Sequence, residues 1–264
     1  MIDVHAHVLW GIDDGAQDRE TSLGMLALAA ATGTTSVIAT PHILDYSDRT
    51  PWSSICASVA ELNKETDGVK LYPGAEIMLS WEMLDAYEDG PGAYCLNGSR
   101  YALVELPMYQ IPLCVDDFWY ELRLMGKVPV LAHPERYPAL WKQPERLLTW
   151  FQEGMLLQIN GGSLLGSFGA AAQHNAQVLL RNKLVSFVGS DAHGLGRRNT
   201  DLRALQEELV KLAGEETAHS ICETWPQYIL EDRMLELELP AKLQSLPKPS
   251  LWQRLWSSIS KNTH

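Results

Sequence analysis

Seven short apolar segments recur along the chain, and segments with helical periodicity separate most of them. The apolar segments predict strands at residues 1–4, 36–40, 69–72, 101–105, 128–132, 156–159 and 185–188. The amphipathic segments predict helices at residues 19–31, 115–125, 144–153, 167–181, 201–213 and 215–223, and one more that begins at residue 51. Strands that alternate with helices are typical of parallel β/α units. The length of 264 residues suits a β/α barrel with at most a few missing or distorted units.

A doubly wound open sheet is the alternative to a barrel, but no G-x-G-x-x-G motif follows the first predicted strand. No internal repeat and no Pro/Gly-rich linker interrupts the sequence before residue 240, so we expect one domain at residues 1–240. Beyond it, Pro240 and the sequence Leu-Pro-Lys-Pro-Ser at 246–250 predict a linker. Residues 241–264 are therefore expected to form a linker and a short amphipathic tail.

The tail carries five apolar residues at helical spacing. They are Leu251, Trp252, Leu255, Trp256 and Ile259. Two tryptophans beside one arginine and one lysine suit a membrane interface. A short segment with two cations binds lipid weakly, so we favour a helix that docks on the barrel or on another copy of the chain. Weak membrane contact through residues 251–261 is the alternative.

The charge balance excludes several classes of protein. Lys and Arg total 21 against 33 Asp and Glu, and the resulting net charge of −12 disfavours binding to nucleic acid or anionic lipid. No apolar run reaches the roughly 18 residues of a membrane-spanning helix, and the first residues do not form a signal peptide. The four cysteines stand far apart without a C-x-x-C motif, which fits a reducing cytoplasm.

Imidazoles and carboxylates follow six of the seven predicted strands. These candidate metal ligands are His5, His7, Asp14, His42, Glu76, Glu105, His133, Asp191 and His193. In a β/α barrel the carboxyl ends of the strands meet at one mouth, where active sites lie. A lone histidine after a strand is usually a satisfied hydrogen-bonding group, but H-x-H and D-x-H place two ligands on one side of an extended chain. The combined pattern predicts a metal site.

Nine ligands are too many for one divalent ion and suffice for two or three ions that share a bridging carboxylate. The set lacks cysteine, and mixed His and carboxylate ligands suit Mn, Fe or Zn. Four carboxylates contribute −4 and three divalent ions +6, so the site would carry +2 and attract an anion such as a phosphate monoester.

Two arginine positions suggest how a phosphate would be held. Arg136 stands three residues after His133, where its guanidinium could bind phosphate oxygens or form a salt bridge with a barrel carboxylate. Arg197 and Arg198 could form an outer rim for an acidic or phosphorylated segment, although such a pair is more often part of a solvated turn.

Other nucleophiles find no support in the sequence. A cysteine phosphatase needs an arginine six residues after its cysteine, whereas those positions hold Leu62, Tyr101, Tyr120 and Tyr228. There is no G-x-S-x-G elbow and no G-x-x-x-x-G-K-[ST] loop. A metal-bound hydroxide is the remaining candidate.

Six motifs make the sequence resemble the PHP (polymerase and histidinol phosphatase) superfamily, and within it the bacterial manganese-dependent protein-tyrosine phosphatases of capsule and exopolysaccharide synthesis. The opening MIDVHAHVLWGIDDGAQD is followed in order by ATPH at 39–42, GAEI at 74–77, YALVEL at 101–106, AHPERY at 132–137 and GSDAHG at 189–194. The resemblance covers roughly residues 1–235. It implies an α/β fold that is a distorted (β/α)7 barrel with three divalent ions, manganese first and iron, zinc or cobalt as alternatives.

The resemblance also implies roles for single residues. By motif, His5, His7, Glu76 and Asp191 would hold one ion; Glu76, Glu105 and His133 a second; and Asp14, His42 and His193 the third. Arg136 would bind the substrate phosphate. Family substrates are phosphotyrosines in the tail of a membrane-associated bacterial tyrosine kinase. The resemblance therefore implies an enzyme of the cytoplasm, and the membrane-associated substrate would place it near the inner face of the membrane.

We hypothesise in-line attack by a hydroxide that bridges the ions, while Arg136 and the ions hold the phosphoryl oxygens. Three alternatives stay open: a PHP enzyme acting on a small molecule such as histidinol phosphate, a metal-dependent deacetylase, and a binding module with a vestigial site. The chain departs from some relatives at residues 43–48, which are acidic where those relatives are basic or His-rich. If that segment borders the site, peptide preference will differ.

Overall fold

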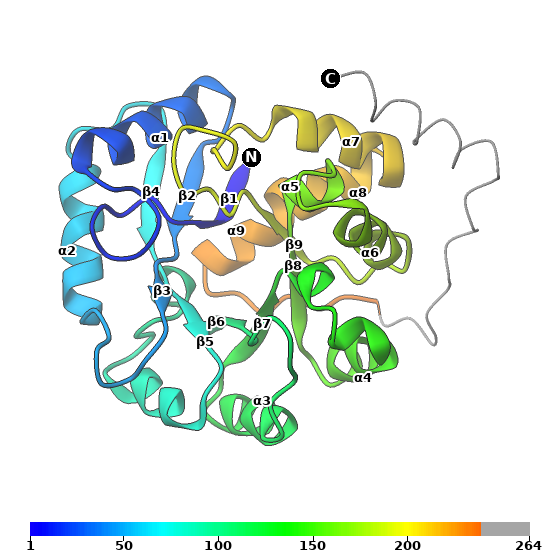
Figure 1. The fold of residues 1–264 in the computed structure, drawn as a ribbon. Coiled ribbons are helices and arrows are strands. Elements are labelled where there is room, and N and C mark those ends of the chain that lie inside the picture. Colours follow the sequence, from blue (N-terminus) through cyan, green and yellow to red (C-terminus); the bar gives the residue numbers. More distant parts are fainter. Residues whose placement is uncertain (239–264) are drawn as a thin grey trace.

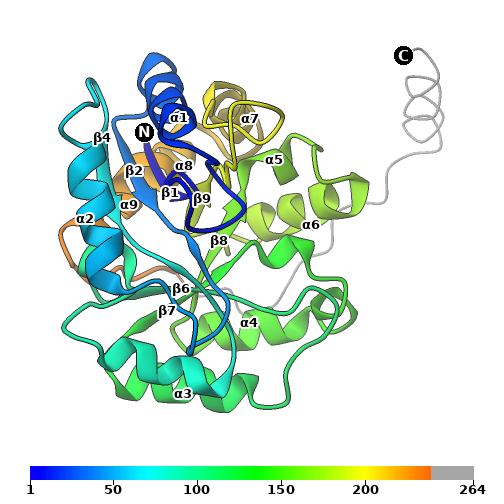
Figure 2. The same cartoon turned by 60° about the vertical axis from the view of Figure 1, so that its left-hand side comes forward.

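The structure is a computed structural model that describes residues 1–238. The predicted tail lies outside these residues. The strands are β1 (Ile2–Ala6), β2 (Ser36–Ala39), β3 (His42–Ile43), β4 (Lys70–Pro73), β5 (Glu76–Met78), β6 (Tyr101–Glu105), β7 (Val128–Ala132), β8 (Leu156–Asn160) and β9 (Phe187–Gly189). The α-helices are α1 (Arg19–Ala31), α2 (Trp52–Leu62), α3 (Val115–Leu124), α4 (Glu145–Gln152), α5 (Gly161–Leu164), α6 (Ala170–Arg181), α7 (Arg203–Ala213), α8 (Glu215–His219) and α9 (Trp225–Leu230). The larger helices surround the strands (Figure 1 and Figure 2).

The strands form a distorted seven-stranded barrel, which confirms the predicted fold class. Every ladder is parallel, in the orders β1-β2-β4 and β3-β5-β6-β7-β8-β9. β3 continues β2 and β5 continues β4, so these four segments fill two strand positions. The ring closes where the amide of Asp191 donates to the His5 carbonyl at 2.8 Å and the amide of His7 donates to the Ala192 carbonyl at 2.9 Å.

Two interruptions in the sheet have local causes that strand prediction did not capture. Pro41 separates β2 from β3 and has no N–H to donate to a ladder. Gly74 separates β4 from β5 at a close approach, because a Cβ there would lie 2.9 Å from Ile38 Cγ2. These breaks shift the strand ends and place His42 and Glu76 side by side in the following ladder.

Helix boundaries also differ from the predictions in places. The helix expected at 167–181 begins at Ala170, because Gly169 precedes it with φ of 91°. The helix expected at 215–223 is α-helical only as far as His219. It continues as a π-helix, Ser220–Thr224, and then as α9, which was not predicted. By contrast, Asp18 caps α1 as expected, since its side chain accepts from the Thr21 amide at 2.8 Å.

The barrel interior is apolar along the first half of its strands. Val4, Leu103 and Val130, each the middle residue of a strand, are fully buried there, and Ile229 of α9 packs against the same cluster. The Tyr101 hydroxyl donates to the Arg233 carbonyl at 2.5 Å, which ties the chain after α9 to the start of β6. The apolar cluster and α9 together fill one end of the barrel, and the polar side chains gather at the opposite, carboxyl end. Within residues 1–238, no helix has the length and apolar character to cross a membrane.

Candidate metal centre

Side chains from the carboxyl ends of the strands converge on one mouth of the barrel. Three sets of predicted ligands can each bring their ligand atoms within 4.8 Å of one another. These sets are His5, His7 and Glu76; His42, Glu76 and Glu105; and His7, Asp14, His42 and His193. The two remaining predicted ligands adjoin them: His133 Nε2 lies 2.8 Å from Glu76 Oε1, and Asp191 Oδ1 lies 3.4 Å from His7 Nε2. The structure therefore brings all nine predicted ligands together.

His5 and His7 aim ring nitrogens at each other. His5 Nδ1 lies 2.9 Å from Gln158 Oε1, and His7 Nδ1 lies 2.7 Å from Asp13 Oδ2. Since each Nδ1 donates its proton to oxygen, the Nε2 atom of each neutral ring carries a lone pair. These Nε2 atoms are 3.1 Å apart, so a proton or a metal cation must lie between them. Second-shell oxygens of this kind orient the histidine ligands of metal sites.

The electrostatics of His7 agree with a site built for a cation. Burial alone would lower the pKa of this imidazole, but hydrogen bonds to Asp13, Asp191 and Glu76 raise it well above its ordinary value. A bound metal ion would take the place of the proton that this environment favours.

Glu76 is the buried centre of the cluster. Its Oε2 lies 3.1 Å from His5 Nε2, 3.4 Å from His7 Nε2 and 3.1 Å from His42 Nδ1. Its Oε1 lies 2.8 Å from His133 Nε2. Burial favours the neutral acid, but the charges and hydrogen bonds of His5 and His133 hold the pKa of Glu76 well below its usual range. The Glu76 carboxylate is thus surrounded by four imidazoles that are candidate metal ligands.

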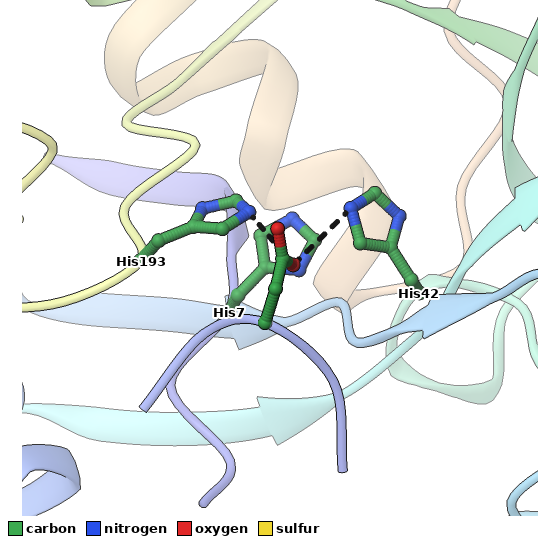
Figure 3. A group of neighbouring side chains, drawn as sticks. His7, His42 and His193 are labelled. Carbon is green, nitrogen blue, oxygen red and sulfur yellow. Dashed lines mark ion pairs between the residues drawn. The ribbon is translucent and has the colours of Figure 1, made fainter. Parts of the chain in front are cut away.

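His7, His42 and His193 point toward one another (Figure 3). Asp14 lies on the exposed side of this group. Its Oδ1 lies 3.3 Å from His193 Nε2 and 3.7 Å from His42 Nε2, and its side chain is 68 % exposed. Burial and the positive charge of His7 lower the pKa of His193 to about 4, so this imidazole is neutral at pH 7. Neutral imidazoles and an ionised carboxylate are the forms that bind divalent metals.

Two buried atoms test whether this donor set fits a metal. His42 Nδ1 and Glu105 Oε1 lie 2.9 Å apart, yet neither has a hydrogen-bond partner within residues 1–238. A buried polar atom without a partner costs about 1–3 kcal/mol. A cation bound between imidazole and carboxylate would satisfy both atoms, so the residues present fit a metal ion.

Asp191 joins the cluster to two arginines. Its Oδ1 lies 2.7 Å from Arg198 Nη2, and its Oδ2 accepts from Arg136 Nη1 at 2.9 Å and from Asn160 Nδ2 at 2.5 Å. We call Arg136 and Arg198 the arginine pair. The Phe168 ring lies below both guanidinium groups, with centroid distances of 4.5 Å to Arg136 and 5.6 Å to Arg198. From the sequence, a salt bridge between Arg136 and a barrel carboxylate was the alternative to a phosphate contact. The structure shows such a salt bridge between Arg136 and Asp191.

Arg197 lies farther out than its neighbour. It is exposed, and its Nη2 donates to the Ser167 carbonyl at 3.0 Å. Arg197, Arg198 and Phe168 share the lining of a cavity of about 290 Å³. Sequence reasoning placed Arg197 and Arg198 together at an outer rim for substrate, whereas the geometry places Arg198 against the candidate metal ligand Asp191.

Sequence reasoning missed the buried polar residues that orient the ligands. The oxygens of Asp13 and Gln158 position the two histidines of the H-x-H motif. Asp3 Oδ1 accepts from the amide of His5 in β1 and from the amide of Ser190, which directly follows β9. The sequence does contain a signal for these residues, which is the alternation of polar and apolar residues within a strand. The polar residues of β1 stand at positions 3 and 5, and those of β8 at 158 and 160.

The acidic segment after His42 borders the site. A groove of about 530 Å³ runs from His42, Asp14 and Glu105 to the chain between β3 and α2. Its outer part includes Asp45 and Asp48. Residues 43–48 therefore border the site, which is the condition under which we expect this acidic segment to affect substrate preference.

Comparisons with known proteins agree with the motifs. The chain matches the family described as "Capsular polysaccharide synthesis, CpsB/CapC" over residues 1–231. The tyrosine-protein phosphatase YwqE of Bacillus subtilis (strain 168) is 32% identical over 227 residues, which are 84% of this chain and 89% of the relative. The tyrosine-protein phosphatase CpsB of Streptococcus pneumoniae is 29% identical over 244 residues, covering 89% of this chain and 100% of the relative.

Solved structures give the same relationship. A chain from the crystal structures of YwqE and CpsB, described as "unique metal-dependent tyrosine phosphatases", matches with a TM-score of 0.84 and 29% identity. The match covers 92% of this chain and 100% of the other. A dihydropyrimidinase from Brevibacillus agri NCHU1002 matches with a TM-score of 0.51 at 13% identity, covering 92% of this chain and 73% of the other, and shares the fold alone. These matches confirm the resemblance inferred from the motifs.

Proposed function

Since this chain belongs to the CpsB/CapC family of capsular polysaccharide synthesis proteins, we propose that it is a metal-dependent protein-tyrosine phosphatase. Its substrate would be phosphotyrosine on a membrane-associated bacterial tyrosine kinase that regulates capsule or exopolysaccharide synthesis. The names of the relatives YwqE and CpsB support the activity, and the family description supports the pathway. The enzyme would act in the cytoplasm beside that kinase, and its four free cysteines fit this location.

The observation that carries the proposal is the convergence of imidazole nitrogens on the buried Glu76 carboxylate. We propose that the nine ligands named above hold three divalent ions, manganese first, with iron, zinc or cobalt as alternatives. When bound, such ions lower the pKa of a shared water and neutralise charge on the phosphoryl oxygens. Three ions against four carboxylates leave a formal charge of +2, which favours a phosphate dianion.

The residues of the chain would then bind and orient the phosphate. Arg136 and Arg198 both contact Asp191, so their N–H groups are fixed at the edge of the cluster and can donate to phosphoryl oxygens. Arg197 would contribute at the outer rim. A phenolate leaving group with a parent pKa of about 10 needs little help from a general acid.

A small phosphoester such as histidinol phosphate is the second candidate, and a deacetylase is the third. The groove of about 530 Å³ beside the ligands favours a peptide, because a small-molecule phosphatase encloses its substrate. The anion-binding arginine pair favours a phosphate over a neutral amide.

The test is phosphate release by metal-stripped protein after addition of Mn, Zn, Co, Fe or Mg. A phosphotyrosine peptide, a phosphoserine peptide and histidinol phosphate are compared. We expect metal-restored turnover of the phosphotyrosine peptide alone, and loss of turnover in His5→Ala and Asp191→Ala with the fold intact by circular dichroism. Turnover confined to histidinol phosphate would move the protein to the small-molecule branch, and near-normal rates in both variants would overturn the metal centre.

A further inference from the structure

The groove beside the metal centre has an apolar wall and an acidic outer end. Ile12 and Leu44 line its walls, and Leu44 is 60 % exposed although it is a large apolar side chain. Asp45 and Asp48 lie farther out, on the segment between β3 and α2. An exposed apolar surface next to a catalytic centre is typical of a surface that contacts substrate.

The acidic charge of this outer end is not balanced within the groove. Asp45 accepts hydrogen bonds from the amide and hydroxyl of Ser47, at 2.7 and 2.6 Å, and these bonds leave its charge in place. The cation that lines the groove is Arg49, but its Nη2 lies 2.9 Å from Asp89 Oδ2 and its Nη1 donates to the Tyr46 carbonyl at 2.6 Å. Two carboxylates therefore face the groove while its arginine is engaged elsewhere.

The inner end of the groove is continuous with the candidate metal centre, because Asp14, His42 and Glu105 line it. Glu105 is buried, and its Oε1 lies 2.9 Å from His42 Nδ1. The arginine pair lies on the other side of the cluster, against Asp191. A bound phosphate is therefore drawn toward the arginines, and the rest of the substrate leaves the centre over the acidic groove.

We propose that this groove binds the residues that flank the phosphotyrosine, and that Asp45 and Asp48 make the enzyme select substrates with lysine or arginine there. The proposal rests on the proposed function and adds a charge preference to it. The apolar walls would contact the tyrosine ring and the carboxylates the flanking cations. Glutamate or aspartate in the flanking positions would meet like charge and bind less well.

The test uses the metal-loaded protein and three phosphotyrosine peptides that differ only in their flanking residues, which are lysine, alanine or glutamate. Exposed ion pairs are weak, so we expect kcat/KM for the lysine peptide to exceed that for the glutamate peptide by about two- to tenfold. The preference should fall at high salt because the charges are solvent-exposed. 4-Nitrophenyl phosphate, which has no flanking residues, monitors the catalytic centre itself.

Two double variants of equal charge separate the groove from general electrostatics. Asp45→Asn/Asp48→Asn should remove the preference and leave hydrolysis of 4-nitrophenyl phosphate unchanged. Glu20→Gln/Asp67→Asn removes two exposed acids outside the groove and should keep the preference. Equal rates on all three peptides, or a preference that survives in the groove variant, would overturn this proposal while the phosphatase assignment stands. Loss of turnover on every phosphotyrosine peptide would overturn both.

Discussion

The Asp13 carboxylate should control how tightly the centre binds metal, although Asp13 is not among the predicted ligands. Its Oδ2 accepts from His7 Nδ1 at 2.7 Å and from the His42 amide at 2.9 Å, and its Oδ1 accepts from the Gly15 amide at 2.9 Å. Burial favours the neutral acid, but the hydrogen bond and charge of His7 and the two amides lower the pKa of Asp13 to about 2. The ionised carboxylate therefore fixes two candidate ligands at once.

The substitution Asp13→Asn keeps the shape and removes one acceptor. An amide has one carbonyl oxygen, so its NH2 group must face either the Gly15 amide or His7 Nδ1, and a buried donor without an acceptor costs about 1–3 kcal/mol. Loss of an outer-shell partner of a metal-binding histidine typically weakens metal affinity by about 10- to 100-fold. That range corresponds to about 1.4–2.7 kcal/mol.

The assay is a chelator-competition titration with Mn²⁺, followed by turnover at saturating metal. Asp67→Asn is the control, because it removes the same charge from an exposed position. We expect weaker Mn²⁺ binding in Asp13→Asn and partial recovery of turnover at high metal concentration. An affinity within about twofold of the parent protein, well below the expected range, would refute the reasoning that Asp13 orients His7.

Three further predictions follow from the same geometry. The pKa of His7 is raised in the folded state, which adds stability below pH 6.5 that is lost as pH rises through the folded value. Metal-free protein should thus lose thermal stability as pH rises above 6.5 while Mn²⁺ affinity rises, and parallel pH profiles would contradict this. Gly189→Ala would place a Cβ 2.5 Å from His5 Cβ, so the free energy of unfolding should fall by about 2 kcal/mol and Tm by about 4–8 °C. Gly194→Ala is the control and should leave Tm unchanged, because there is open space around Gly194. Phe168→Leu removes the ring beneath the arginine pair and should raise KM for a phosphotyrosine peptide about three- to tenfold, with Phe168→Tyr restoring it; equal KM values for both variants would show that the ring does not position the arginines.

The convergence of the candidate ligands was predictable because it depends on short-range spacing. His5 in β1 and His7 just after it lie on one side of the chain by the period of an extended chain, and parallel strands send their carboxyl ends to one mouth. Neither argument needs the distances between strands. The barrel class followed from the same alternation, although Pro41 and Gly74 break two strands in ways that only the folded contacts explain.

The orienting residues were not predictable in this way, because their partners are distant in the chain. Gln158 contacts His5 across 153 residues of sequence, and no local pattern links the two. The difference between Arg197 and Arg198 depends on a turn, where a shift of one residue decides which guanidinium faces inward. The amide of His193 donates to the Arg198 carbonyl at 3.0 Å, and Arg198 Nε donates to the Asp191 carbonyl at 3.2 Å. These bonds fold the turn back on the D-x-H motif and bring Arg198 inward.

Backbone conformation at the site is consistent with a functional constraint. His133 and Asp191 adopt left-handed conformations, with φ of 34° and 51°. Such a conformation costs a residue with a Cβ about 1–2 kcal/mol, and strain of this kind persists where the surrounding structure holds it in place. Here the carboxylates of Glu76 and Asp191 and the arginine pair supply that restraint. His133 directly follows β7 and Asp191 stands two residues after the end of β9, so the strained backbone redirects the chain while the side chain stays in the mouth. The same contacts that hold this strain place His133 beside Glu76 and Asp191 beside the arginine pair, so the geometry proposed for metal and phosphate is already set by the protein chain.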